Sequence, residues 1–338
     1  MSRVYILILN WNGWGDTIEC LESVFRNVYK DFRVIVCDNG SVDGSLSHIR
    51  SWSKGELDSF VPSGNPLRRL SHPPIRKPVS IWEYDRAQAE DGGAETDPGA
   101  PLILVTNKDN LGYAGGNNVG LRYVLARDDF EYVWLLNNDT VIEPDALSQL
   151  VSTMKANPEA GVCGSTLPFY GNPDILWARG GARYNKWIPF LSKCIDHSTP
   201  ATRPCNPMEI EQGIDFVAGA SMLISRPFLR EIGLLCEDYF LYFEELDWSM
   251  RARGRFLLAY SPESIVYHKV GASTGMMGTF PARESKTLRY YIRRNSILFA
   301  RKYHPYTLPT VYFCFAIYGI YSFFRARISA WIGREGNP

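Results

Sequence analysis

The sequence predicts an α/β fold with a mostly parallel sheet. Short continuous apolar runs alternate with helical patterns, and a polar residue follows each run. The runs cover residues 3–9, 33–38, 102–105 and 132–136. Runs of this length between turn residues are typical of strands that are buried on both faces of a sheet. Strands that alternate with helices favour an open parallel sheet covered by helices.

A strand–helix–strand unit opens the chain. The first run ends in Asn-Trp-Asn-Gly and the second in Asn-Gly-Ser. Residues 14–28 between them predict a helix, because apolar side chains recur there at helical spacing, and Asp16 or Thr17 can cap its start. The apolar positions are Ile18, Leu21, Val24, Phe25 and Val28.

Residues 52–101 interrupt this alternation. They contain many proline, glycine and charged residues and show little periodicity. This composition predicts a long surface insertion. A solvated loop is the expected form, and a dedicated specificity element is the alternative.

The second half of the chain has a different pattern. Short strand-like runs, among them VCGSTLPFY and FVAGASMLIS, flank an aromatic-rich stretch that contains Trp177, Tyr184 and Trp187. Residues 151–280 are therefore expected to form a mixed half that shapes the acceptor side.

The C-terminal segment is basic and then apolar. Residues 281–303 predict a basic amphipathic helix, and residues 305–324 are strongly apolar and aromatic. With two prolines and a glycine, the apolar stretch is marginal for crossing a hydrocarbon core of roughly 30 Å. It is more typical of an element that lies on a membrane surface. Packing on the domain itself or on a second subunit, as in a homodimer, is the alternative.

The composition is that of an ordinary globular protein. The 338 residues are 45% hydrophobic, which is enough for a sizeable core. The 36 basic and 36 acidic side chains cancel, so no excess of charge indicates nucleic-acid binding. Seven cysteines without a Cys-X-X-Cys pair fit a reducing compartment. The first apolar run is too short for a signal peptide, and we expect the protein in the cytoplasm.

Polar residues gather at the expected carboxyl ends of the strands. Asn10, Asp38, Asn107 and Asp139 follow the four runs. In open α/β sheets, ligands bind outside this edge. A carboxylate at Asp139 is placed where a divalent ion would connect it to a diphosphate, and a plain turn in which the side chain bonds the backbone is the alternative.

A glycine-rich turn, NLGYAGGNNVG at residues 110–120, opens another predicted helix. Backbone amides in such a turn can approach a phosphate or a ribose closely. The spacing departs from the Gly-X-Gly-X-X-Gly fingerprint, which argues against a plain NAD-dependent enzyme. Small residues that only pack the helix against a strand are the alternative.

An acidic cluster and a histidine complete the candidate residues. Glu244, Glu245 and Asp247 begin a predicted helix after the aromatic run YFLYF. Acids in a first turn can simply complement the helix dipole, whereas crowded carboxylates in apolar surroundings have raised pKa values that suit a general base. His268 ends a strand-like run. A lone histidine is more often structural, but imidazole is a common metal ligand.

The order of these segments resembles family 2 glycosyltransferases of the GT-A fold, and most closely the rhamnosyltransferase-like subgroup. The segments that carry the resemblance are ILNWNG, VCDNGSVDGS, NLGYAGGNNVG, LLNNDT, FVAGASMLI, YFLYFEELDW and the strand that ends in His268. They extend to about residue 300 and leave out only the insertion. The resemblance implies a GT-A domain over 1–280, with a nucleotide-sugar half (1–150) and an acceptor half (151–280), followed by a helical segment (281–338).

The resemblance also implies the role of each site residue. Asp139 would bind a divalent metal, Mg²⁺ or Mn²⁺, and His268 would be a further contact to the metal or the diphosphate. Glu245 would be the catalytic base, although this chain has Glu244-Glu245 where the family often has Glu-Asp, so Glu244 stays in view as the base. The implied donor-binding residues are Asn10, Asn12, Asp38, Asn110, Gly112, Gly116, Asn117 and Asn138.

The resemblance predicts an inverting enzyme with dTDP-L-rhamnose as the favoured donor and UDP-sugars next. The acceptor would be a glycan or a polyprenyl-linked glycan, reached through a peripheral contact with the inner face of the membrane. A catalytically silent nucleotide-sugar-binding scaffold is the main alternative. A sugar nucleotidyltransferase is less favoured, because it should carry a glycine-rich loop with Arg and Lys directly after the first strand.

Overall fold

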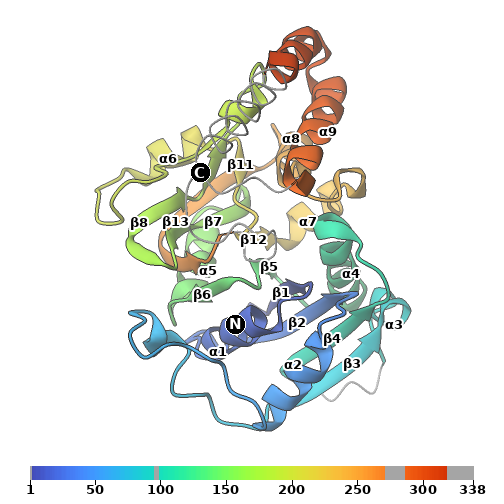
Figure 1. Ribbon diagram of the computed structural model, residues 1–338, viewed down its shortest axis with the longest axis vertical. Helices are drawn as coiled ribbons and strands as arrows, with labels where there is room; N and C mark the ends of the chain where they lie inside the picture. Colours follow the sequence, from blue (N-terminus) through green and yellow to red (C-terminus); the bar gives the residue numbers. More distant parts are fainter. Residues whose placement is uncertain (1, 95–98, 271–285, 318–338) are drawn as a thin grey trace, which may run out of the picture.

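The structure, a computed structural model, describes residues 2–94, 99–270 and 286–317. One mixed sheet runs through this part of the chain in the order β10-β9-β8-β7-β12-β5-β1-β2-β4-β3, and helices cover both of its faces (Figure 1). The predicted α/β class is confirmed.

The first half is the parallel part of the sheet. Its strands are β1 (Val4–Asn10), β2 (Phe32–Asn39), β3 (Ile81–Asp85), β4 (Leu102–Asn107) and β5 (Tyr132–Asn137). Neighbouring strands in this group are all parallel. Four of the five are the predicted apolar runs, and their carboxyl ends lie at one edge.

Alternate residues of β1 enter two separate cores. Ile6 packs with α1 (Trp14–Val24) and α2 (Ser45–Lys54) on one face. Leu7 packs with α4 (Gly112–Arg127) on the other face. A strand buried on both faces has no polar alternation, which explains the continuous apolar run in the sequence.

The insertion is not a solvated loop, and this expectation was wrong. It contains the 3₁₀ turn η1 (Arg68–Leu70), the edge strand β3 and α3 (Arg86–Glu90). The segment IWEYD of β3 escaped the sequence argument because an edge strand keeps polar side chains and is short. Only residues 95–98 lie outside the described part.

A buried carboxylate fastens the insertion to α1. Glu22 is fully buried, and its Oε1 accepts hydrogen bonds from Trp52 Nε1 at 2.8 Å and Lys77 Nζ at 2.6 Å. Its Oε2 accepts from the backbone N–H of Ile75 at 2.8 Å. A buried charge that is satisfied this way ties three chain segments together.

The second half adds mostly antiparallel strands. They are β6 (Thr140–Ile142), β7 (Ala160–Phe169), β8 (Asn172–Arg179), β9 (Gly181–Arg183), β10 (Lys193–Cys194), β11 (Phe216–Val217), β12 (Ser221–Ser225) and β13 (Leu257–His268). Its helices are α5 (Ala146–Ala156), α6 (Pro207–Gly213), α7 (Arg226–Ile232) and α8 (Glu244–Ala252), with the 3₁₀ turns η2 (Pro189–Leu191) and η3 (Glu237–Tyr239). The strand β13 pairs in parallel with β7 and antiparallel with β6, which places His268 opposite Thr140.

The described C-terminal part is a helix pair that packs on the second half (Figure 1). The helix α9 (Lys286–Tyr303) buries Phe299 against Tyr239 and Leu246. The turn η4 (Pro305–Thr307) leads into a helix over residues 308–317. Packing on the domain itself, one of the two alternatives for this segment, therefore holds for α9. The rest of the predicted segment, residues 281–285 and 318–338, lies outside the described residues, and the division at residue 280 stays a prediction.

Among the described residues, no helix combines the length and the apolar character that crossing a membrane requires.

Candidate active site

The ends of β1 and β2 hold a buried polar group. Asn10 and Asp38 are paired in register, and Nδ2 of Asn10 donates to Oδ1 of Asp38 at 2.7 Å. Thr17 Oγ1 donates to Oδ1 of Asn10 at 2.8 Å, and the backbone N–H of Ser41 donates to Oδ2 of Asp38 at 3.1 Å. These bonds fix the Asp38 carboxylate at the sheet edge, as the strand-end argument predicted.

The neighbouring loops are tied to this group. Asn12 has a left-handed backbone (φ 50°), and its Oδ1 accepts from the N–H of Val42 at 2.8 Å. Its own N–H donates to Ser41 Oγ at 2.8 Å. Asn138 Nδ2 donates to Thr17 Oγ1 at 3.1 Å. Asn12, Asp38 and Asn138 thus belong to one connected set of hydrogen bonds around the ends of β1 and β2.

The glycine-rich turn is organised by Asn39, a residue that the sequence argument missed. Its Nδ2 donates to Asn110 Oδ1 at 2.9 Å and to the carbonyl of Gly112 at 3.1 Å. Gly112 has φ 72°, and a Cβ there would lie 2.3 Å from the carbonyl oxygen of Phe240. Only glycine fits this backbone approach.

Two predicted donor-binding residues of this turn have packing roles. A Cβ on Gly116 would lie 2.5 Å from Leu9 Cδ1, so Gly116 lets α4 approach β1. Asn117 Nδ2 donates to the carbonyl of Tyr113 at 2.9 Å. The packing alternative therefore explains these two residues, and a contact with a donor stays a prediction.

Asp139 and His268 come together at the next strand end. Oδ1 of Asp139 lies 3.2 Å from Nε2 of His268, and both residues are buried. The Trp177 ring meets the imidazole edge-on at 4.6 Å between centroids. Although burial would raise the pKa of Asp139, the neighbouring His268 and Lys269 lower it overall. The carboxylate therefore stays ionised.

Two polar atoms of the Asp139–His268 pair lack a hydrogen bond. Within the described residues, Asp139 Oδ1 and His268 Nδ1 have no hydrogen-bond partner of good geometry. Buried polar atoms are nearly always satisfied. Besides its ion pair with His268 Nε2, Asp139 Oδ1 could therefore take a further polar ligand.

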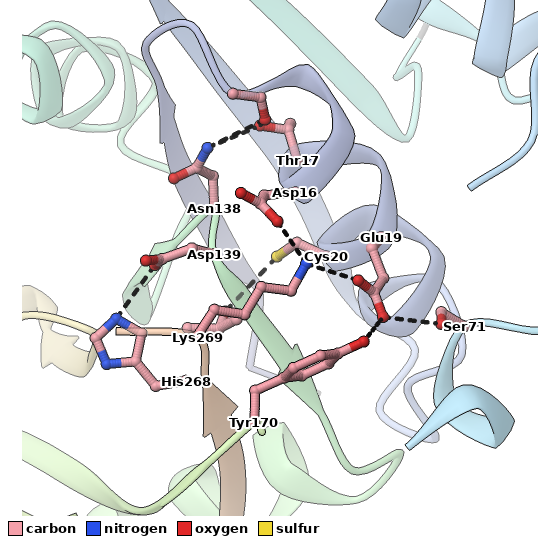
Figure 2. A network of polar contacts seen from close by, with 12 residues as sticks. Asp16, Thr17, Glu19, Cys20, Ser71, Asn138, Asp139, Tyr170, His268 and Lys269 are labelled. Carbon is pink, nitrogen blue, oxygen red and sulfur yellow. Dashed lines mark hydrogen bonds and ion pairs between the residues drawn. The ribbon is translucent and has the colours of Figure 1, made fainter. Parts of the chain in front are cut away.

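Lys269 is used by the protein itself rather than left for a ligand (Figure 2). Its Nζ lies 2.6 Å from Glu19 Oε2 and also contacts Asp16. Tyr170 OH donates to Oε1 of Glu19 at 2.7 Å. The backbone N–H of Lys269 donates to the carbonyl of Asp139 at 2.9 Å. The network therefore locks the end of β13 to α1, next to the Asp139–His268 pair.

The two glutamates at the start of α8 differ in access. Glu244 is 1% exposed and Glu245 is partly exposed. Burial, and then the charge of Glu245, raise the pKa of Glu244 well above its ordinary value. Burial raises the pKa of Glu245 to about 7. A Cβ on Gly219 would lie 2.1 Å from Glu245 Oε1, so this carboxylate lies directly against the backbone of the segment FVAGAS, residues 216–221. Access favours Glu245 over Glu244 for contact with a ligand.

Tyr113, in the first turn of α4, contacts the segment directly before β12. Its hydroxyl donates to the carbonyl of Gly219 at 2.8 Å. Burial raises its pKa most, followed by the charges of Glu245, Glu244 and Asp139. Carboxylates at the start of α8 and directly after β5 therefore both act electrostatically on this partly exposed side chain.

The loop before α8 is strained and is fastened by α9. Phe240, Tyr242 and Phe243 have φ values of 63°, 68° and 81°. Non-glycine residues at positive φ cost free energy and persist only where surrounding contacts impose them. Asn295 of α9, which is fully buried, donates from Nδ2 to the carbonyls of Tyr239, Leu241 and Tyr242 at 2.9, 2.8 and 2.8 Å.

Asp247, the third acid of the cluster, has a structural role. It is fully buried and accepts from Arg251 Nε at 2.8 Å, Lys302 Nζ at 2.7 Å and Tyr303 OH at 2.7 Å. Although burial opposes it, these partners lower the pKa of Asp247. The side chain joins α8 to α9 and is not available to a ligand.

A family model decides the class of this site. The model of glycosyl transferase family 2 matches residues 5–62 and 94–233, more than half of the chain. The chain belongs to glycosyl transferase family 2. The matched residues include the ends of β1, β2, β4 and β5. The unmatched stretch between the two matched ranges, residues 63–93, is the middle of the insertion. The predicted family is confirmed.

Curated relatives cover part of this glycosyltransferase. It is 30% identical over 154 residues to the low-salt glycan biosynthesis hexosyltransferase Agl10 of Haloferax volcanii, which is 45% of this chain and 46% of the relative. It is 25% identical over 238 residues to hyaluronan synthase 3 of Xenopus laevis, which is 68% of this chain and 35% of the relative. The chain spans less than half the length of each.

The solved structure of GalNAc-T7 has the same fold at low identity. The structure of GalNAc-T7 with UDP, GalNAc and Mn²⁺ has a TM-score of 0.52 and 13% identity, over 79% of this chain and 44% of that one. The mannosyltransferase PcManGT of Pyrobaculum calidifontis, in complex with GDP-Man and Mn²⁺, has a TM-score of 0.48 and 16% identity, over 98% of this chain and 80% of that one. The predicted GT-A fold is confirmed for this glycosyltransferase.

Proposed function

We propose that this glycosyltransferase is an inverting, metal-dependent enzyme that transfers a sugar from a nucleotide-sugar donor to a hydroxyl of a glycan or lipid-linked glycan. The observation that carries the proposal is the buried Asp139–His268 pair at the carboxyl edge of the sheet. The partly exposed Glu245, with its pKa raised to about 7 by burial, is the candidate base. A base whose pKa lies near the working pH is suited to proton abstraction.

The residues present fit a divalent ion. Two neighbouring ligands of an octahedral ion at about 2.1 Å lie about 3 Å apart, close to the 3.2 Å between Asp139 Oδ1 and His268 Nε2. A carboxylate suits Mg²⁺ and Mn²⁺, and an imidazole favours the transition metal. Among the described residues no group of three or more His, Cys, Asp or Glu side chains could hold a metal, so the donor diphosphate and water would supply the other ligands. The Mn²⁺ in the GalNAc-T7 structure supports this choice.

The proposed reaction is a single displacement. Glu245 takes the proton of the acceptor hydroxyl while that oxygen bonds to the anomeric carbon of the donor. The bond from this carbon to the diphosphate oxygen breaks, and its electron pair leaves with the nucleoside diphosphate, so the configuration inverts. When bound, the metal ion neutralises the charge that develops on the diphosphate. Asp38, Asn10 and Asn12 would hold the nucleoside at the ends of β1 and β2.

The proposed donor and acceptor are supported by the family resemblance and by the C-terminal helices. The subgroup resemblance favours dTDP-L-rhamnose, with UDP-sugars next. A lipid-linked acceptor is supported by the described C-terminal helices, where residues 286–317 hold six basic residues and no acid. The same helices expose Tyr312 and Phe313. A peripheral contact with the cytoplasmic face of a membrane would follow.

Calorimetry with a panel of nucleotide sugars tests the donor and the metal together. We expect one donor to bind in the presence of Mn²⁺ or Mg²⁺, and we expect this binding to be lost when the metal is removed by a chelator. Asp139→Asn should lose the same binding, whereas Asp145→Asn, which removes an exposed carboxylate directly before α5, should keep it. Donor binding that survives both chelation and Asp139→Asn would contradict the metal assignment.

Turnover tests the base. Glu245→Gln should lower the rate by about 10²- to 10⁴-fold and leave donor affinity unchanged, because removing a general base affects the chemical step. Full activity of Glu245→Gln would refute its role. A wild-type protein that binds a donor and transfers it to no acceptor would instead support the silent scaffold.

A further inference from the structure

A second pocket lies in the acceptor half, between β9 and β10. Its volume is about 460 Å³. Its walls include Arg183, Tyr184, Lys186, Trp187, Leu191 and Lys193. None of these residues belongs to the candidate donor site, which lies at the ends of the parallel strands.

The pocket brings together three cations and no carboxylate. Arg183 Nε donates to the carbonyl of Gly213 at 3.0 Å, and Lys186 Nζ donates to Tyr306 OH at 3.3 Å. In the described part of the chain, neither of these residues nor Lys193 forms an ion pair with an acid. Three cations that are not neutralised create a local positive potential, and this potential favours a ligand with at least two negative charges.

Two aromatic side chains, Tyr184 and Trp187, form part of the pocket wall. Trp187 is 45% exposed, and its ring meets that of Tyr306 edge-on at 5.7 Å. The Tyr184 hydroxyl is buried and has no hydrogen-bond partner among the described residues. A buried tyrosine hydroxyl normally finds a partner. Because this hydroxyl is closed off from solvent, the Trp187 ring is the aromatic surface that a ligand in the pocket would reach.

The position of the pocket connects the catalytic helix with the C-terminal helices. The Tyr184 ring packs edge-on against Phe243, the residue directly before Glu244, at 5.9 Å. On the other side, Tyr306 belongs to η4, and the helix that follows exposes Tyr312, Phe313 and Ile317. The pocket therefore lies between the acidic residues and an exposed apolar surface.

We infer that this pocket binds the diphosphate of the acceptor, and that the acceptor is a sugar joined through a diphosphate to a lipid. The diphosphate would lie among Arg183, Lys186 and Lys193. The sugar would then point toward Glu245, and the lipid toward Tyr312 and Phe313. The inference rests on the proposed function and names the acceptor class that this function leaves open.

The test uses the full chain, with inorganic pyrophosphate, farnesyl diphosphate and farnesol as the ligands. Binding is followed by calorimetry in chelator, so that the donor site does not take up pyrophosphate through a metal. We expect both diphosphates to bind and farnesol to bind far more weakly. Lys186→Gln with Lys193→Gln should weaken diphosphate binding by about tenfold or more for each charge, because bonds to ionised groups are the strong ones.

The matched control is Lys54→Gln with Lys155→Gln, which removes two exposed lysines from α2 and α5. Diphosphate binding that is the same in both double variants would overturn the inference. Equal affinity for pyrophosphate and farnesyl diphosphate would overturn its lipid part. Nucleotide-sugar binding with Mn²⁺ is measured on the same variants, and its retention there separates a failure of this pocket from a failure of the proposed function.

Discussion

Replacing Asn295 tests whether α9 positions the catalytic loop. Asn295→Ala removes the amide that donates to the carbonyls of Tyr239, Leu241 and Tyr242. One amide has two hydrogens, so the three contacts are worth about two full hydrogen bonds, or roughly 1–3 kcal/mol. The Tyr239 carbonyl keeps the backbone N–H of Leu241 as a donor, and the carbonyls of Leu241 and Tyr242, which lose the amide, add about 1–3 kcal/mol. We expect the free energy of unfolding to fall by about 2–6 kcal/mol.

The catalytic effect should exceed what a loss of stability explains. The strained loop ends directly before Glu244, and a displacement of about 1 Å in a reacting group lowers a rate by about 10²-fold. We therefore expect Asn295→Ala to lower kcat by about one to two orders of magnitude with an unchanged KM for the donor. Asn295→Asp has the same shape but no donor hydrogens, and it should behave in the same way.

The measurements are steady-state kinetics and urea unfolding of each variant. Ser296→Ala is the control, because Ser296 is the neighbouring buried residue and its hydroxyl donates only within α9, to the carbonyl of Ile292 at 2.7 Å. It should keep kcat. If Asn295→Ala loses stability but keeps the wild-type kcat, Asn295 merely anchors the helix and the positioning argument is wrong.

Three other predictions concern pH, a glycine and the insertion. The pKa of about 7 at Glu245 should make kcat fall tenfold per pH unit below that value. This decrease of kcat at low pH should be absent in Glu245→Gln, and its persistence there would point to another titrating group. The same shift favours the folded state below the ordinary value of 4.5, an advantage that is lost as the pH rises to about 7. Gly112→Ala should lower kcat and stability, because its methyl group would fall 2.3 Å from a carbonyl oxygen, whereas Gly15→Ala, with open space around it, should be neutral. Lys77→Met should lower the free energy of unfolding by about 3 kcal/mol, because it removes the nearer of the two cations that pair with the buried Glu22 and leaves only Arg26 at 3.6 Å. A loss below about 1 kcal/mol in urea unfolding would mean that the Lys77–Glu22 pair is not structurally important.

The strand-end part of the site could be predicted from sequence because it depends on local pattern. A polar residue after a buried run marks the carboxyl end of a strand, and parallel pairing then aligns Asn10 with Asp38. The glycine-rich turn was found in the same way, through residue types that a close backbone approach requires. Its glycines have different duties, however. Gly112 meets the loop before α8, and Gly116 meets Leu9, and no pattern in the sequence separates the two.

The rest depends on contacts between distant segments. Nothing local indicates that β13 returns to pair with both β6 and β7, so the proximity of Asp139 and His268 came only from the family resemblance. Asn295 lies in the middle of a basic amphipathic helix and looks like any polar position there. The edge strand β3 has polar side chains and too few residues for a periodic signal.

The pairing of β6 with β13 has a consequence for how the proposed metal site would form. Asp139 directly precedes β6, and His268 faces Thr140 across the ladder. A slip of one residue in that pairing would turn the imidazole to the opposite face of the sheet. The two ligands are thus assembled by a contact that closes a very long loop, and such contacts form late in folding. An ion that needs both ligands would bind the native chain and ignore earlier states, so its binding free energy would stabilise the last step of folding.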